Sequence, residues 1–144
     1  MNRTSADRLP SGGEASMDAQ TFARAFWRDV ARQDATALTA YFLPEAQIRW
    51  HCTNERFSVT EYVRANCEYP GDWAGEVERV ECAGGVLITA TRVWLTDSGA
   101  AFHATSFFHM AGGKIAELDE YWGDDGAAPE WRRSMEIGVP IGEK

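Results

Sequence analysis

Apolar and polar positions repeat with a helical period in the first part of this chain. In MDAQTFARAFWRDVARQ the apolar residues Phe22, Phe26 and Val30 follow one another at every fourth position, which predicts an amphipathic helix. Asp34 is a suitable N-cap for a second short helix, ATALTAYF, and Pro44 follows just past the expected end of that helix. Two helices are therefore predicted before any strand.

The rest of the chain is predicted to consist mostly of strands. AQIRWHCTN alternates with a period of two, and the capping box Ser58-Val59-Thr60-Glu61 then opens a third helix that runs to the turn YPGD. Four β-rich runs follow, separated by connections that contain glycine: WAGEVERVECA, VLITATRVWL, AAFHATSFFHM and KIAELDEYW. This order predicts an α+β fold, in which one curved antiparallel sheet forms a cone around three N-terminal helices.

Five polar residues fall at positions that the periodicity assigns to the core. A buried polar group must be paired or used, so such positions are candidates for function. In the last strand Glu120 shares a face with Leu118 and Trp122, whereas Glu117 and Asp119 take the other face. The full inward set is Asn54, Asn66, Arg92, Ser106 and Glu120.

The chemical role of Glu120 depends on its neighbours, and the sequence is consistent with two interpretations of that role. Enclosure by Trp50, Leu118 and Trp122 would raise the pKa of the Glu120 carboxyl and let it exchange a proton near neutral pH. If Arg92 is close, the pKa shift reverses, and Glu120 becomes a fixed anion that orients a ligand or forms a structural ion pair. The inward Asn and Ser residues are equally consistent with hydrogen bonds to the backbone.

Composition and charge narrow the class of protein. The 144 residues fit one domain, and the net charge of -8 disfavours nucleic acid and anionic membranes as partners. Three cysteines without a C-x-x-C pair predict neither a disulfide framework nor a metal site. The first sixteen residues lack the apolar core of a signal peptide, which predicts a cytoplasmic protein. We expect a flexible leader at 1–16, one domain at 17–138 and a tail at 139–144.

Four motifs, in this order along the chain, resemble one group of known proteins. WHCTNERF, NCEYPGDW, TSFF and DEYWGDDGAAPEWR are similar to motifs of small bacterial nuclear-transport-factor-2-like proteins, which are related in fold to the SnoaL-like polyketide cyclases. The resemblance covers about Met17 to Gly138 and implies a cone-shaped curved sheet and a homodimer through the outer sheet face.

The wider superfamily contains cyclases, ketosteroid isomerases, scytalone dehydratases, limonene epoxide hydrolases and binding proteins without chemistry, so the fold alone fixes no reaction. In its catalytic branches the inward acid of the last strand often transfers protons on an apolar cyclic substrate, and Glu120 occupies the comparable place. The chain departs from the epoxide hydrolases, which pair two aspartates around an arginine, because only one carboxylate is inward. It departs from the dehydratases because His51 and His103 fall on outward faces.

Two hypotheses follow. The first is a cofactor-free enzyme of the cyclase or isomerase type, in which Glu120 moves a proton while Asn54, Asn66 and Ser106 donate hydrogen bonds to the substrate; the apolar walls of its pocket would be Trp50, Tyr62, Trp73 and Trp122. The second is a ligand-binding or dimerisation module without chemistry, in which Glu120 and Arg92 form a structural pair. The segment Gly123-Asp124-Asp125-Gly126 is predicted to be a turn.

Overall fold

The structure of this chain is a computed structural model that describes residues 17–142. The predicted leader at 1–16 lies outside the described residues, so the proposed domain boundaries stay a prediction. The helices are α1 (Met17–Ala31), α2 (Ala35–Ala40), α3 (Val59–Cys67) and the short α4 (Glu130–Arg133). The strands are β1 (Phe42–Trp50), β2 (Glu55–Ser58), β3 (Trp73–Ala83), β4 (Val86–Leu95), β5 (Ala101–Ala111) and β6 (Lys114–Asp124).

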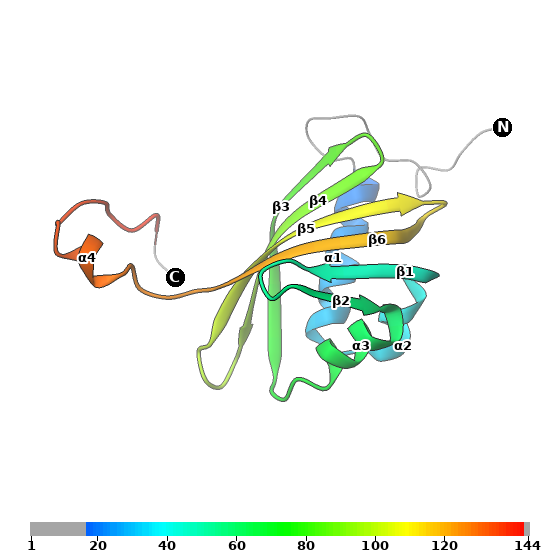
Figure 1. Ribbon diagram of the computed structural model, residues 1–144, viewed down its shortest axis with the longest axis horizontal. Helices are drawn as coiled ribbons and strands as arrows, with labels where there is room; N and C mark the ends of the chain where they lie inside the picture. Colours follow the sequence, from blue (N-terminus) through cyan, green and yellow to red (C-terminus); the bar gives the residue numbers. More distant parts are fainter. Residues whose placement is uncertain (1–16, 143–144) are drawn as a thin grey trace.

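The six strands form one curved, unclosed sheet in the order β2-β1-β6-β5-β4-β3. The helices α1, α2 and α3 lie on the same side of this sheet (Figure 1), which confirms the predicted α+β architecture. Neighbouring strands are antiparallel except for β1 and β6, which are parallel. The sheet is therefore mixed rather than purely antiparallel.

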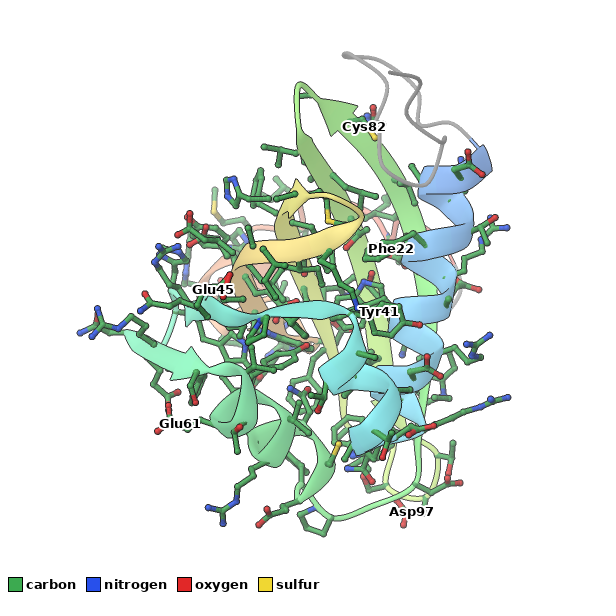
Figure 2. All side chains as sticks on the ribbon, turned by 90° about the vertical axis from the view of Figure 1, so that its right-hand side faces the viewer. Phe22, Tyr41, Glu45, Glu61, Cys82 and Asp97 are labelled. Atoms are coloured by element: carbon green, nitrogen blue, oxygen red, sulfur yellow. The ribbon has the colours of Figure 1, made fainter. Side chains whose placement is uncertain are left out.

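The core lies between α1 and the sheet, as the helical period predicted. Phe26 and Trp27 are almost fully buried, and the ring of Phe26 meets that of Phe108 on β5 edge to face at 5.0 Å. Phe22 and Tyr41 point toward each other between α1 and the start of β1 (Figure 2), with ring centroids 5.5 Å apart. Each such ring contributes about 2–3 kcal/mol by leaving water.

The predicted caps of α2 and α3 are both present. The Asp34 side chain accepts a hydrogen bond from the Ala37 backbone at 3.1 Å. The Ser58 hydroxyl accepts from the backbone N–H of Glu61, whose side chain accepts in turn from the backbone N–H of Ser58. Each cap stabilises its helix by about 1 kcal/mol.

The first strand differs from its prediction at both ends. It begins at Phe42 and contains Pro44, which fits there because the pairing of β1 with β6 is interrupted between Phe42 and Gln47 and needs no N–H donor. It ends at Trp50, and an exposed turn leads to the short edge strand β2, which was not predicted. The inward position predicted for Asn54 was wrong: Asn54 is exposed in that turn with a φ of 58°. Asparagine tolerates this left-handed conformation better than most residues.

The predicted facing of β4 was also wrong. The residues that face the helices are Leu87, Thr89, Thr91 and Val93, whereas Arg92 lies on the outer face. Because Ile88, Ala90 and Trp94 make the outer face of this strand apolar as well, the alternation of VLITATRVWL does not reveal which side is inward. Arg92 is therefore not a partner of Glu120.

The last strand runs to Asp124, so the predicted turn at 123–126 begins later than expected. The segment beyond it leaves the body of the molecule (Figure 1) and exposes a series of large apolar side chains. These are Trp131, Met135, Ile137, Val139 and Ile141. No helix within residues 17–142 has the length and apolar character needed to cross a bilayer.

Candidate functional site

A cavity of about 350 Å³ lies at one end of the curved sheet. It is bounded by the C-terminal ends of α1 and α3, by the turn between β1 and β2, by the start of β3 and β5, and by the end of β4 and β6. This volume is sufficient for a bicyclic organic molecule and lies in the usual range for ligand pockets.

The walls of the cavity are aromatic. Five rings line it, those of Trp50, Tyr69, Trp73, Phe102 and Trp122. Trp73 meets Tyr69 edge to face at 4.9 Å, and Trp50 meets Trp122 at 6.2 Å. These contacts hold the rings at fixed angles, and they leave a mostly apolar concave surface.

The turn between α3 and β3 is held by two residues. Gly71 has a φ of 125°, a backbone conformation that residues with a side chain rarely adopt and that glycine adopts readily. Gln33, just after α1, donates its side-chain N–H to the carbonyl oxygens of Asn66 at 2.8 Å and Tyr69 at 2.5 Å. Together they position Tyr69 and Trp73 at the rim of the cavity.

Glu120 lies beneath the cavity and not in its wall. Its side chain is fully buried, and among the described residues it does not line the cavity. The indole N–H groups of Trp50 and Trp122 donate to its Oε1 atom at 3.0 Å and 3.4 Å, and the Ser106 hydroxyl lies 2.6 Å from its Oε2 atom. Two tryptophans of the cavity wall are thereby anchored to one buried carboxyl group.

Burial raises the pKa of Glu120, and the hydrogen bonds from Ser106, Trp50 and Trp122 oppose that rise. An indole N–H only donates, whereas a serine hydroxyl both donates and accepts. When Glu120 binds a proton, the proton therefore belongs on Oε2, from which it is donated to Ser106. A proton could therefore move from Glu120 to the cavity only by way of the Ser106 hydroxyl, or directly after one of the two indoles has moved aside.

The structure brings together only some of the residues predicted for the site. Trp50, Asn66, Trp73 and Trp122 line the cavity. Tyr62 is inward but packs behind the wall, with its ring 6.2 Å from that of Trp50. Ser106 is inward and reaches only Glu120, while Asn54 and Arg92 lie elsewhere. The role of each as a ligand contact stays a prediction.

Several lining residues were missed by the sequence reasoning. Asp124 has the same parity as Glu120 and Trp122, so extending the alternation by two residues would have found it. Phe102 has the same parity as Ser106 on β5, so the alternation of that strand also places it inward. No sequence pattern indicated that Glu55 lines the cavity, because the strand β2 that carries it was not predicted.

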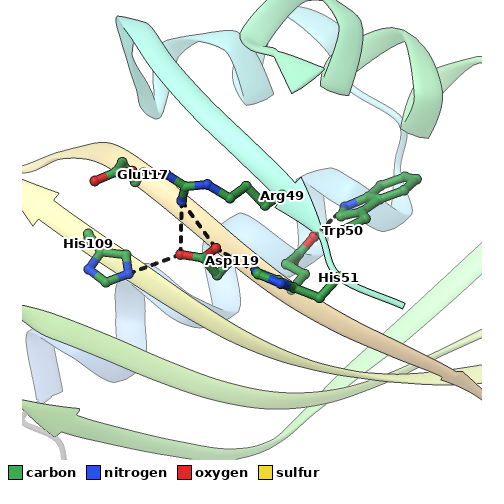
Figure 3. Close-up of polar contacts among 7 residues, drawn as sticks. Arg49, Trp50, His51, His109, Glu117 and Asp119 are labelled. Carbon is green, nitrogen blue, oxygen red and sulfur yellow. Dashed lines mark hydrogen bonds and ion pairs between the residues drawn. The ribbon is translucent and has the colours of Figure 1, made fainter. Parts of the chain in front are cut away.

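The outer face of the sheet carries two charged clusters. Asp119 lies at the centre of one (Figure 3), where it contacts Arg49 at 3.2 Å, His51 at 2.7 Å and His109 at 3.2 Å. Arg49 also binds Glu117, and Trp50 points away from this group. Burial alone would raise the pKa of Asp119, but hydrogen bonds from His51 and Arg49 outweigh it and leave that pKa below its ordinary value.

The second cluster surrounds His103. Its Nδ1 atom lies 2.5 Å from Asp125, its Nε2 atom lies 3.0 Å from Glu78, and Arg92 donates to Asp125 at 3.0 Å. The predicted outward positions of His51 and His103 are thus confirmed. Within residues 17–142, no three potential metal ligands gather into a metal-binding group.

Comparison with known proteins identifies the fold. A protein from Kribbella flavida, named as a candidate ketosteroid isomerase, is 22% identical over 85% of this chain and 90% of its own, with a TM-score of 0.69. A nuclear-transport-factor-2-like protein of unknown function from Burkholderia xenovorans is 21% identical over 85% and 95%, with a TM-score of 0.66. A candidate SnoaL-like polyketide cyclase from Shewanella putrefaciens is 9% identical over 73% and 79%, with a TM-score of 0.62.

These likenesses show that the chain has the nuclear-transport-factor-2-like fold, as the four motifs implied. No protein-family model matches the sequence, and no curated protein does. At this level of sequence identity, a shared fold does not establish a shared activity.

Proposed function

We propose that this protein binds a small apolar or aromatic molecule in the cavity at the end of the sheet. The observation that carries the proposal is the set of five rings around a space of about 350 Å³, two of them anchored to the buried Glu120. A binding site needs walls that hold their shape when empty, because ordering them on binding costs free energy. The Glu120 anchor supplies that rigidity.

The test uses a neutral bicyclic probe, naphthalen-1-ylmethanol, measured by isothermal titration calorimetry. We expect saturable binding of one probe per chain. Trp73→Ala should weaken binding at least tenfold, because it removes one wall of the cavity. Trp131→Ala is the matched control, since Trp131 lies outside the cavity and is 62% exposed. Absence of binding to the unmodified protein would reject the proposal.

A second candidate is a cofactor-free isomerase or cyclase, in which Glu120 transfers a proton. It is favoured by the burial that raises the pKa of Glu120 and by the position of this carboxyl one indole away from the cavity. An acid or base must come within hydrogen-bond reach of its substrate, so either the Trp50 or the Trp122 indole has to turn aside during the reaction.

This candidate is tested with 2-tetralone, a bicyclic ketone whose protons next to the carbonyl exchange with deuterium when a base removes them. The protein should accelerate this exchange, and Glu120→Gln should abolish the acceleration while binding of the neutral probe persists. Exchange at an unchanged rate in the Glu120→Gln protein would exclude Glu120 as the base.

We further propose that two copies associate through the outer face of the sheet. Ile88, Trp94 and Phe107 are half-buried there, and within residues 17–142 no helix covers them. Apolar surface of this kind is typical of an interface. The proposal agrees with the homodimer that the sequence resemblance implied.

A further inference from the structure

We infer, building on the binding function proposed above, that the ligand of this cavity is a cation: an aromatic or alicyclic molecule that carries a protonated amine. Three features of the cavity, each independent of the others, favour positive charge. They are two carboxylates without a counter-charge, the aromatic rings of the wall, and the ends of two helices.

Glu55 and Asp124 are the two charged residues that line the cavity. Asp124 has no hydrogen-bond or ion-pair partner for its carboxylate among the described residues, and Glu55 accepts only from the Thr53 hydroxyl at 2.7 Å. No lysine, arginine or histidine of the described chain lines the cavity. On the outer face of the sheet Asp119 and Asp125 each contact an arginine, whereas the two exposed carboxylates of the cavity have no charged partner among the described residues.

The aromatic walls bind a cation better than a neutral group. The face of an indole ring is negative and attracts an ammonium group within about 6 Å of its centre. Trp50 and Trp122 both donate their N–H to the Glu120 carboxyl group, which draws the proton away from the ring and makes the ring face more negative. The buried acid thus acts on the ligand through the two indoles.

The helix ends add to the same field. The last residues of α1, Val30 and Ala31, and the last turn of α3, including Asn66, line the cavity. Helix C-termini carry partial negative charge, which stabilises a nearby cation and repels an anion. An anionic ligand would therefore be opposed by the carboxylates, the rings and both helices at once.

The test compares three probes of nearly the same shape. They are naphthalen-1-ylmethylammonium, naphthalen-1-ylmethanol and 1-naphthoate, titrated into the full chain at pH 7 by calorimetry. We expect the ammonium probe to bind about tenfold more tightly than the alcohol, and 1-naphthoate to bind more weakly than the alcohol. Raising the NaCl concentration from about 50 to 500 mM should weaken binding of the ammonium probe and leave the alcohol unchanged.

Variants locate the source of the preference. The double substitution Glu55→Gln and Asp124→Asn should remove most of the advantage that the ammonium probe has over the alcohol. Glu45→Gln, which removes one exposed carboxylate near the opposite end of β1, should leave the preference intact.

The possible outcomes separate this inference from the binding function itself. Equal affinity for the ammonium probe and the alcohol overturns the inference and leaves the binding proposal standing. An unchanged preference in the double variant also overturns it, because the charge would then come from elsewhere. If none of the three probes binds, the binding proposal fails and the inference fails with it.

Discussion

Trp50 and Glu120 lie opposite each other in the parallel pair of β1 and β6, and the indole N–H of Trp50 donates to the carboxyl group of Glu120 at 3.0 Å. The same indole lines the cavity. One tryptophan therefore connects a fully buried acid with the surface that would meet a ligand. Changes at Glu120 are expected to act on both the stability of the fold and the shape of the cavity.

Replacing Glu120 by leucine should destabilise the protein strongly. The substitution leaves the N–H groups of Trp50 and Trp122 and the Ser106 hydroxyl without their partner inside the core. Each unpaired buried group costs about 1–3 kcal/mol, so we expect a loss of about 3–5 kcal/mol in urea unfolding. Glu120→Gln keeps an oxygen for the two indoles and should cost far less. Equal losses in both variants would mean that these hydrogen bonds contribute little.

The pH dependence of stability offers a separate test of Glu120. Because its pKa in the folded protein is raised above the ordinary value of 4.5, the folded state holds the proton more tightly than the unfolded state. The resulting stabilisation is complete below pH 4.5 and is lost as pH rises through the folded pKa. The free energy of unfolding of Glu120→Gln, relative to the unmodified protein, should therefore increase from pH 4.5 toward neutrality. A pH-independent difference would contradict the raised pKa.

Thr91 and Thr89 form a matched pair on the inner face of β4. Both are fully buried, but the Thr89 hydroxyl accepts from the Trp27 indole at 3.1 Å, whereas the Thr91 hydroxyl has no partner among the described residues. Thr91→Val removes an unpaired polar group at nearly constant shape and should stabilise the protein by about 1 kcal/mol. Thr89→Val should destabilise it by about 1–2 kcal/mol because Trp27 loses its acceptor. Thermal unfolding of the two variants checks the opposite signs.

Asp119 should govern part of the acid sensitivity of the fold. Its pKa lies below the ordinary 3.8, so its stabilising contribution is present above pH 3.8 and is lost as pH falls through the folded pKa. Asp119→Asn should cost about 1–2 kcal/mol at pH 7 and should reduce the loss of stability on acidification. The exposed turn residue Asp97, substituted in the same way, serves as the control for a simple change of net charge.

Association through the outer face can be measured by sedimentation equilibrium. We expect a dimer, and Phe107→Asp should shift it to monomer by placing a charge in the apolar part of that face, where the Phe107 ring meets Tyr121 at 6.1 Å. Thr36→Asp on the exposed side of α2 introduces the same charge away from the sheet and should leave the dimer intact. A monomeric unmodified protein would refute the proposed interface.

Most of the fold was predictable from the sequence because local signals agree with the final structure. The period of α1, the caps at Asp34 and Ser58, and the inward face of β5 and β6 all carry the expected side chains into the core. The errors in the predicted fold arose where the alternation is ambiguous or where the structure depends on contacts between distant parts of the chain. Both faces of β4 are apolar, so only its pairing with Cys82 and Ser106 on the neighbouring strands places Arg92 outside.

The candidate site was less predictable, for a physical reason. The inward position of Glu120 follows from alternation alone, but its distance from the cavity depends on how the Trp50 and Trp122 indoles turn. The Trp50 indole packs against Tyr62 on the following helix, and the Trp122 indole packs against Trp27, which lies far away in sequence. Asp124 and Glu55 join the site only because β6 runs two residues further than expected and β2 exists at all.

The hairpin between β1 and β2 gives the fold room for evolutionary change. Its turn at 51–54 is exposed, and β2 is a four-residue strand at the edge of the sheet, yet Cys52, Thr53 and Glu55 border the cavity. Insertions or deletions there would alter the size and charge of the opening without disturbing α1 or the central strands. Selection can therefore change what this scaffold accepts while the determinants of its folding stay constant.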